Sequence, residues 1–232
     1  MSNFHIIPAA GSASRIGGLP KYLLPVGKLA LPLLFFHIKM AQNCNYPVRI
    51  AVHPSLAEYI SELCLNWGFI DAKVISIQSK TMTETCLHMT SDLPESATVT
   101  ISMPDTFYTQ MNSIDTLTSL IKLQEIAPSL ALWKIQASQI GKLGQVEIDA
   151  SASKIMRIVD KDLSCTFESS WGMIALPLSI LRTFSILDPA IGMSLEKLIS
   201  VGLNLNYLEI PGKYFDCGTI TEYREALNWS LM

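Results

Sequence analysis

The sequence predicts an α/β fold, in which a mostly parallel mixed sheet is flanked by helices and carries a small antiparallel extension. Three observations support this prediction. The chain has 232 residues, which suits a single domain over residues 1–232. Apolar residues make up 49% of the sequence and charged residues only 16%, as expected for a largely buried central sheet. Strand-like and helix-like segments alternate through the first half, which is the order of a Rossmann-like sheet.

The first half of the chain supplies most of the predicted sheet. Runs of aliphatic and β-branched residues predict strands at Phe4–Ile7, Val48–Val52, Val74–Ile77, Thr98–Ser102 and Leu130–Gln136. Between them, helices are predicted at Pro32–Gln42, Ser55–Trp67, Thr83–Ser91 and Ile114–Gln124. Ser55 is expected to cap its helix, because Glu58 stands where a capping box requires an acidic residue.

The second half changes character. Three short strands follow one another with little helix between them, at Gln145–Ile148, Ile155–Val159 and Trp171–Leu176, and they predict the antiparallel extension. Helices are predicted at Leu176–Leu187, Leu195–Val201 and Thr219–Trp229, with a strand at Leu205–Ile210. The sequence shows no repeat, linker or low-complexity segment, so one compact domain is expected.

Charge and cysteine content exclude several classes of protein. The formal net charge is −3, which gives no reason to expect a nucleic-acid partner. The five cysteines form no C-x-x-C pair, so reduced thiols are expected rather than disulfides or a zinc knuckle. No signal peptide is expected, because the N-terminal segment lacks a basic leader and a long apolar region. No membrane span is expected, because Pro32 and His37 break the longest apolar stretch. These features predict a cytoplasmic protein without membrane contact, and the apolar composition is compatible with a homo-oligomer.

The stretch HIIPAAGSASRIGGLPKYLLPVG, from His5 to Gly27, holds the first candidate site. Small residues follow the first predicted strand, and they allow backbone N–H groups to approach an anion closely. Arg15 can bind phosphate oxygens with its planar fork, and Lys21 can supply a point charge. In an open α/β sheet such a loop lies at the edge where ligands bind. An ordinary surface loop with two cations is the alternative.

Two familiar phosphate-binding motifs are excluded at this loop. The Walker pattern G-x-x-x-x-G-K-[ST] fails, because Gly11 and Gly17 are wrongly spaced and no Lys follows the second. The dinucleotide pattern G-x-G-x-x-G fails because Ala13 stands where its second glycine belongs.

The motif A-A-G-x-x-x-R followed by P-K-x-L-L-P-V resembles the signature of the sugar-1-phosphate nucleotidylyltransferases, in the nucleotide-diphospho-sugar transferase superfamily. The short gap between Arg15 and Lys21 is similar to that of the acetylglucosamine-1-phosphate uridylyltransferase and methylerythritol-phosphate cytidylyltransferase branches. Six later segments resemble the family's motifs in the family's order: Gln78 with Thr83-Glu84-Thr85, ISMPDTFY, KLGQVEID, IVDKD, WGMIALP and YFDCGTITEYREA. The resemblance therefore spans nearly the whole chain.

The resemblance implies a role for each matching residue. The expected nucleotide-binding residues are Ala9, Ala10, Gly11, Ser12, Ala13, Ser14, Gln78 and Thr83. Arg15 and Lys21 are the expected catalytic cations, and Gly144 and Lys161 the expected contacts of the sugar phosphate. Asp105 and Asp216 are the expected ligands of Mg²⁺. The implied partners are an NTP and a sugar phosphate or other phosphorylated small molecule.

The chemistry of these residue types agrees with that assignment. Nucleotidyl transfer needs positioning and neutralisation of phosphate charge rather than a protein nucleophile. Mg²⁺ prefers oxygen ligands, usually one or two carboxylates together with phosphates and water. Each residue also has a simpler explanation, because an Asp after a strand is often a turn former and the Asp-Lys-Asp run around Lys161 is often a solvated turn.

The sequence departs from the family at several positions. Ala13 replaces a glycine and Pro104 replaces the glycine before Asp105, while Asp160 and Asp162 flank Lys161 in place of Glu and Pro. These departures leave two alternatives open: a cytidylyltransferase acting on choline phosphate or a polyol phosphate, and a non-catalytic regulatory homologue that binds nucleotide or sugar phosphate. The β-helix acyltransferase domain of some relatives is not expected.

Overall fold

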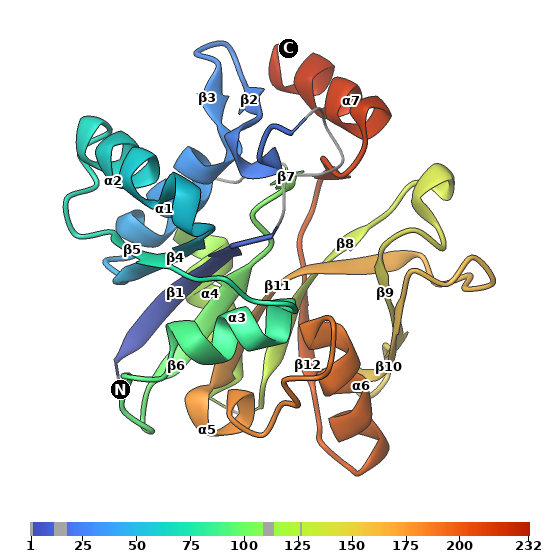
Figure 1. Ribbon diagram of the computed structural model, residues 1–232. Helices are drawn as coiled ribbons and strands as arrows, with labels where there is room; N and C mark the ends of the chain where they lie inside the picture. The colour runs from blue at the N-terminus through green and yellow to red at the C-terminus, as the bar shows by residue number, and fades with distance from the viewer. Residues whose placement is uncertain (1, 12–17, 109–113, 126) are drawn as a thin grey trace.

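The computed structural model describes residues 2–11, 18–108, 114–125 and 127–232 (Figure 1). Its N-terminal half contains the strands β1 (Asn3–Ala9), β4 (Val48–Val52), β5 (Lys73–Ser76) and β6 (Thr98–Ser102). They lie in the order β5-β4-β1-β6, and every pairing among them is parallel. The connecting helices are α1 (Leu33–Asn43), α2 (Ala57–Asn66) and α3 (Met82–Met89). These elements confirm the predictions for this half, with boundaries that agree within two residues.

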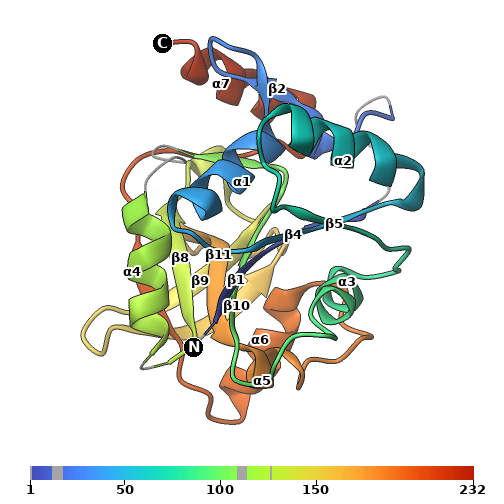
Figure 2. The same cartoon turned by 90° about the vertical axis from the view of Figure 1, so that its left-hand side faces the viewer.

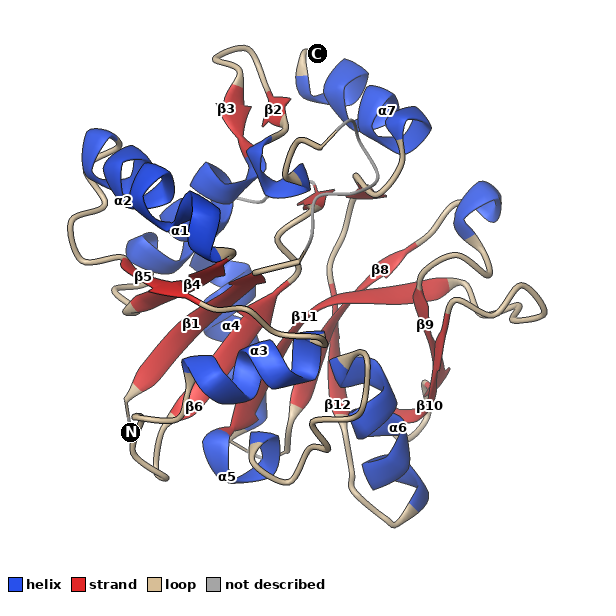
Figure 3. Cartoon of the chain, in the orientation of Figure 1, coloured by secondary structure: helices blue, strands red, loops and turns tan. Residues whose placement is uncertain are grey.

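The second half of the sheet corrects the prediction of a mostly parallel sheet. Its strands are β8 (Ser129–Lys134), β9 (Gly144–Asp149), β10 (Lys154–Asp160), β11 (Ser169–Pro177) and β12 (Asn206–Glu209). They continue the described sheet in the order β6-β11-β8-β12-β10-β9, and all of these pairings except β8–β12 are antiparallel (Figure 3). The short turn between β9 and β10 allows only antiparallel pairing of these two strands, because parallel neighbours would need a long crossover.

The antiparallel part also closes on itself, which the sequence did not indicate. β9 pairs with β10 on one side and with β11 on the other, so β11, β8, β12, β10 and β9 form a closed ring of strands. The helices of this half are α4 (Ile114–Gln124), α5 (Leu178–Leu181), α6 (Ile191–Ser200) and α7 (Ile220–Ser230). None of the described helices combines the length and apolarity that a membrane span requires.

Three helix predictions are corrected, and the first is the helix predicted over Leu195–Val201, which begins earlier, at Ile191, as α6. Ser55 does not cap α2, because it lies in a 3-10 turn, Pro54–Leu56, where its hydroxyl bonds the His53 ring. The helix predicted over Leu176–Leu187 is limited to α5, since Leu176 belongs to β11 and the hydroxyl of Thr183, just beyond the helix, donates to the Ile180 carbonyl within it.

Two small sheets outside the main one complete the described elements. β2 (Pro25–Val26) pairs with β3 (Leu31–Pro32), and β7 (Thr106–Tyr108) pairs with β13 (Tyr214–Asp216), both in antiparallel fashion. The β7–β13 pair is important for function, because it joins two segments that lie far apart in the sequence.

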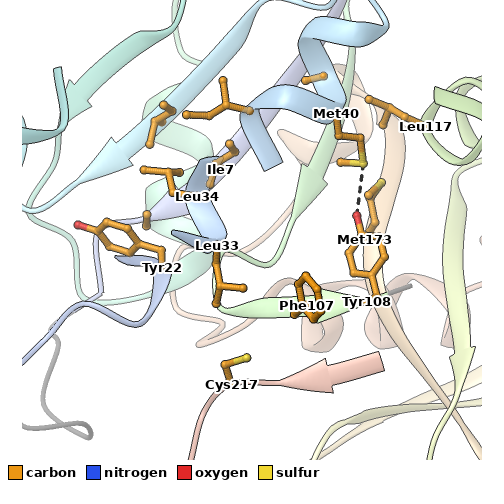
Figure 4. Packing of buried hydrophobic residues seen from close by; sticks show 14 of the residues in the cluster. Ile7, Tyr22, Leu33, Leu34, Met40, Phe107, Tyr108, Leu117, Met173 and Cys217 are labelled. Carbon is orange, nitrogen blue, oxygen red and sulfur yellow. Dashed lines mark hydrogen bonds between the residues drawn. The ribbon is translucent and has the colours of Figure 1, made fainter. Parts of the chain in front are cut away.

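Hydrophobic residues pack on both faces of the sheet. Figure 2 shows α1 and α2 on one side of the N-terminal strands and α3 on the other. The cluster under α1 and α4 includes Tyr108, whose hydroxyl lies 3.3 Å from the sulfur of Met40 (Figure 4). The second cluster lies under α3, α5 and α6. Each fully buried aliphatic or aromatic side chain contributes about 1.5–3 kcal/mol, so these clusters hold the strand ends in place.

Candidate functional site

A cleft of about 680 Å³ opens at the carboxyl ends of the parallel strands. Segments that follow β1, β4, β5 and β6 line one side of it, and residues of β9, β10 and β11 line the other. Nine of the residues predicted for the site line this cleft: Ala9, Ala10, Gly11, Lys21, Gln78, Asp105, Gly144, Lys161 and Asp216. The fold therefore brings together residues from most of the length of the chain.

The end of β1 forms the floor of the cleft. Ala9 and Ala10 are buried, and Gly11 is exposed with open space around its Cα. Their lack of bulk leaves the backbone accessible to a ligand at this edge of the sheet. Four of the predicted residues lie outside the described residues, namely Ser12, Ala13, Ser14 and Arg15, and their roles stay predictions.

Lys21 and Asp105 form an ion pair inside the cleft. Lys21 begins a 3-10 turn directly after Pro20, and Asp105 follows β6. Lys21 Nζ donates to Asp105 Oδ2 at 2.9 Å, and both side chains are about three-quarters buried. A pair so close to the surface contributes little to stability, about 0–1 kcal/mol, so its main effect is to hold both charged groups in the cleft.

Asp216 lies beside Asp105 because β7 and β13 pair. In this pair Asp216 stands opposite Thr106, and the Cys217 N–H donates to the Asp105 carbonyl at 2.9 Å. Burial and the nearby carboxylates of Asp105 and Glu222 raise the pKa of Asp216 to about 7. The two aspartates therefore lie close enough to repel each other, and a cation between them would relieve that repulsion.

The donor set around these aspartates fits Mg²⁺. A Cβ added at Gly218 would stand 2.8 Å from Asp216 Oδ1, so the glycine leaves room for that carboxylate. The described residues hold no cluster of three or more His, Cys, Asp or Glu side chains suited to a metal. Two carboxylates without further protein ligands suit a metal that completes its shell with water and substrate phosphates. Asp105 and Asp216 are the residues that would hold it.

Lys161 and Gly144 lie on the opposite side of the cleft from β1. Lys161 follows β10 with φ of 54°, and its backbone N–H donates to the Leu143 carbonyl at 3.1 Å. Gly144 begins β9 opposite Asp160. The segment around Lys161 is a turn, as its composition indicates, and the turn lines the cleft.

Of the two nucleoside contacts predicted beyond the first loop, Gln78 lines the cleft and Thr83 does not. Gln78 lines it from the segment after β5, with an exposed side chain. Thr83 does not line it, because its side chain is fully buried in α3, where its hydroxyl finds no hydrogen-bond partner among the described residues. Thr85 lines the cleft instead, and its hydroxyl bonds Ser79 and the Thr81 carbonyl. Helix geometry explains this outcome, since residues two apart on a helix face different directions.

The chain resembles known proteins in its fold. No protein-family model and no curated protein matches the sequence. Among solved structures, a candidate glucose-1-phosphate thymidylyltransferase of Bacillus anthracis, in complex with sucrose, matches with a TM-score of 0.82 and 18% identity, over 99% of this chain and 95% of that one. A UDP-glucose pyrophosphorylase complexed with UDP-glucose matches with a TM-score of 0.80 and 18% identity, over 99% and 98%.

A third match is the UTP-bound UGPase of Acinetobacter baumannii, with a TM-score of 0.75 and 14% identity, over 99% of this chain and 93% of that one. The chain has the fold of the sugar-1-phosphate nucleotidylyltransferases. The nucleotidylyltransferase fold agrees with the resemblance of its sequence motifs, and it spans nearly the whole chain.

Several residues that line this cleft were not predicted from the sequence. His53 lines it directly after β4, and the rule that ligands bind beyond the carboxyl ends of strands was sufficient to find it. Lys80 adds a third lysine to the cleft, beside Lys21 and Lys161. Trp171 lines it from the middle of an apolar strand, where no local pattern separates a site residue from a core residue.

Proposed function

We propose that the chain is a Mg²⁺-dependent nucleotidylyltransferase that joins an NTP to a sugar-1-phosphate and releases pyrophosphate and an NDP-sugar. The observation that carries this proposal is the meeting of four charged residues in one cleft of the nucleotidylyltransferase fold. These residues are Lys21, Asp105, Lys161 and Asp216, and they come from separate segments of the chain.

The proposed reaction makes and breaks one bond at the α-phosphorus. A phosphate oxygen of the acceptor attacks the α-phosphorus of the NTP and forms the new P–O bond. The bond from the α-phosphorus to the bridging oxygen of the β-phosphate breaks, and pyrophosphate leaves with the electron pair. The protein provides no nucleophile, and its residues place two anions together and neutralise their charge.

Each charged residue has a distinct task in this proposal. Lys21 binds the β- and γ-phosphates and stays with the departing pyrophosphate, and Arg15 is proposed for the same task. Lys161 binds the phosphate of the acceptor from the other side of the cleft. Asp105 and Asp216 hold Mg²⁺, which supplies charge neutralisation at the phosphate oxygens when bound.

The first substrates to test come from the structural neighbours. One neighbour is complexed with UDP-glucose and another is bound to UTP. We therefore propose UTP and glucose-1-phosphate as the first pair, within a panel of the four NTPs against sugar-1-phosphates, choline phosphate and a polyol phosphate. Pyrophosphate release in the presence of Mg²⁺ is the measurement.

The panel separates the remaining alternatives. Turnover with one NTP and a sugar-1-phosphate supports the proposal. If turnover occurs only with CTP and either choline phosphate or a polyol phosphate, the acceptor is that compound and not the proposed sugar-1-phosphate. Nucleotide binding without pyrophosphate release from any pair favours the regulatory homologue and contradicts the proposed reaction.

A further inference from the structure

Trp171 occupies an unusual position in the cleft. It belongs to β11, its side chain is only 8% exposed, and it lines the cleft beside Gly144. Its indole N–H makes no hydrogen bond with any described residue, and unlike the N–H of Trp133 it is not sealed in the core. An indole N–H that can be reached from the cleft and has no partner among the described residues is available to donate to a ligand.

Two glycines place the indole. A Cβ added at Gly144 would lie 2.5 Å from Trp171 Nε1, and one added at Gly192 would lie 3.3 Å from its ring. The ring therefore fits between β9 and the start of α6 only because both positions lack a side chain. Asp160 stands opposite Gly144 in the β9–β10 pair and also lines the cleft. The Trp171 N–H, a donor, and the Asp160 carboxylate, an acceptor, therefore both lie next to Gly144.

We propose that Trp171 is a specificity-determining residue, whose indole N–H donates to a hydroxyl oxygen of the acceptor and so selects a polyhydroxylated acceptor over a quaternary ammonium one. The inference rests on the proposed function and names the acceptor class of the same site. A sugar hydroxyl both accepts and donates, and the Trp171 N–H and the Asp160 carboxylate offer the matching pair of groups. Lys161, the next residue after Asp160, is left for the acceptor phosphate.

The same geometry disfavours choline phosphate. A trimethylammonium group is recognised by the open faces of aromatic rings. The aromatic rings among the described lining residues belong to Tyr22, Trp171 and Tyr214, and all three are more than nine-tenths buried. Trp171 packs in the cluster under α3, α5 and α6 and is only 8% exposed, so little of its ring is open to a ligand in the cleft. A quaternary ammonium has no lone pair to accept a hydrogen bond from the Trp171 N–H.

The first test observes the indole directly and does not depend on turnover. The ¹H–¹⁵N resonance of the Trp171 indole is assigned by its loss in Trp171→Phe and followed during titration without Mg²⁺. We expect UDP-glucose and glucose-1-phosphate to shift it, and UDP and choline phosphate to leave it in place. The buried indole of Trp133 is an internal control that should not move. An unmoved Trp171 resonance with both sugar ligands overturns the inference.

The second test uses steady-state kinetics on the full chain. Trp171→Phe keeps an aromatic ring and removes only the donor, so the KM for the sugar-1-phosphate should rise about 3- to 10-fold, as for the loss of one hydrogen bond. The KM for the NTP should stay within about twofold, because the nucleotide does not contact this donor. Trp67→Phe is the matched control, since Trp67 packs on Phe35 and Phe69 away from the cleft. An unchanged acceptor KM in Trp171→Phe contradicts the inference.

A second variant covers the case in which Trp171→Phe folds poorly. Gly192→Ala crowds the indole without removing it, because its Cβ would lie 3.3 Å from the ring, and it should raise the acceptor KM in the same direction. If both variants release pyrophosphate from sugar-1-phosphates with an unchanged acceptor KM, the proposed function is supported and the inference about Trp171 is contradicted. If UDP-glucose shifts the Trp171 indole resonance but no substrate pair releases pyrophosphate, the inferred contact is supported and the proposed reaction is contradicted.

Discussion

Lys21 Nζ lies 2.9 Å from Asp105 Oδ2, so a proposed phosphate-binding lysine is paired with a proposed metal ligand. In the absence of ligand, each group neutralises the other. Triphosphate and Mg²⁺ would compete for the two partners at once, since the phosphates attract the lysine and the metal attracts the carboxylate. The ion pair therefore keeps both side chains in position while preventing an uncompensated charge in the cleft.

Replacement of Asp105 by Asn should abolish turnover and leave the fold intact. The amide keeps the size of the side chain but removes the charge that would hold Mg²⁺, so we expect a loss of at least about 10³-fold in kcat. The unfolding temperature should fall by only a few degrees, because a partly exposed ion pair contributes about 0–1 kcal/mol. Pyrophosphate release and a thermal melt measure the two effects. The exposed Asp71→Asn is the control, and a fully active Asp105→Asn variant would refute the metal assignment.

Replacement of Lys21 by Met should weaken catalysis more than it weakens the fold. The apolar chain preserves most of the packing but removes the cation proposed for the leaving pyrophosphate. We expect kcat/KM to fall by about 10²- to 10³-fold, as for the loss of one preorganised charge at a developing anion. Steady-state kinetics with varied NTP test this, with the exposed Lys28→Met as control. Equal activity of the two variants would remove Lys21 from the mechanism.

The first half of the fold was predictable because its signals are local. Each strand there is a short aliphatic run, and α3 shows its N-terminus in the sequence, where the Thr81 hydroxyl accepts from the Glu84 N–H. The closing pairing of β9 with β11 was not predictable, because neither strand carries a pattern that names its partner. The strands β7 and β13 have three residues each, which is too short for periodicity to appear.

The candidate site was predictable to the extent that it depends on strand ends. Asp105 and Asp216 follow apolar runs, and the resemblance placed both at one edge, where the β7–β13 pair brings them together. The choice between Thr83 and Thr85 was beyond the sequence, because it depends on how α3 is rotated against the sheet. Trp171 was missed for a similar reason, since its place at the cleft depends on how β11 packs beside Gly144 and Gly192.

Replacement of Gly218 by Ala should disturb metal binding through steric displacement alone. The new Cβ would stand 2.8 Å from Asp216 Oδ1 and 3.3 Å from its carboxyl carbon, so the carboxylate must move. A displacement of this size in a catalytic group costs about 10- to 100-fold in rate, and the Mg²⁺ concentration for half-maximal activity should rise. The measurement is a Mg²⁺ titration of pyrophosphate release, with nucleotide affinity without metal as the control. A normal Mg²⁺ dependence would place the metal away from Asp216.

The buried His5 predicts a specific loss of stability on acidification. Its ring nitrogens lie 2.8 Å from the Thr100 hydroxyl and 3.1 Å from the Ser102 hydroxyl, and burial followed by the neighbouring His37 lowers its pKa to about 3. The unfolded chain binds a proton near pH 6.5 while the folded chain does not. The neutral His5 ring therefore makes its full contribution to the free energy of unfolding above pH 6.5, and this contribution is lost as the pH falls toward 3.

The expected loss from His5 is about 2 kcal/mol between pH 7.5 and pH 5, and it can be isolated by substitution. Urea unfolding of His5→Gln should show a lower stability at pH 7.5 but a weaker decline toward pH 5, because glutamine does not titrate. The exposed His88→Gln should keep the slope of the unmodified protein. His37, whose own pKa is lowered to about 4 by burial, contributes in the same direction and accounts for part of the remaining slope. Identical slopes in His5→Gln and the unmodified protein would show that His5 is not the buried neutral group described here.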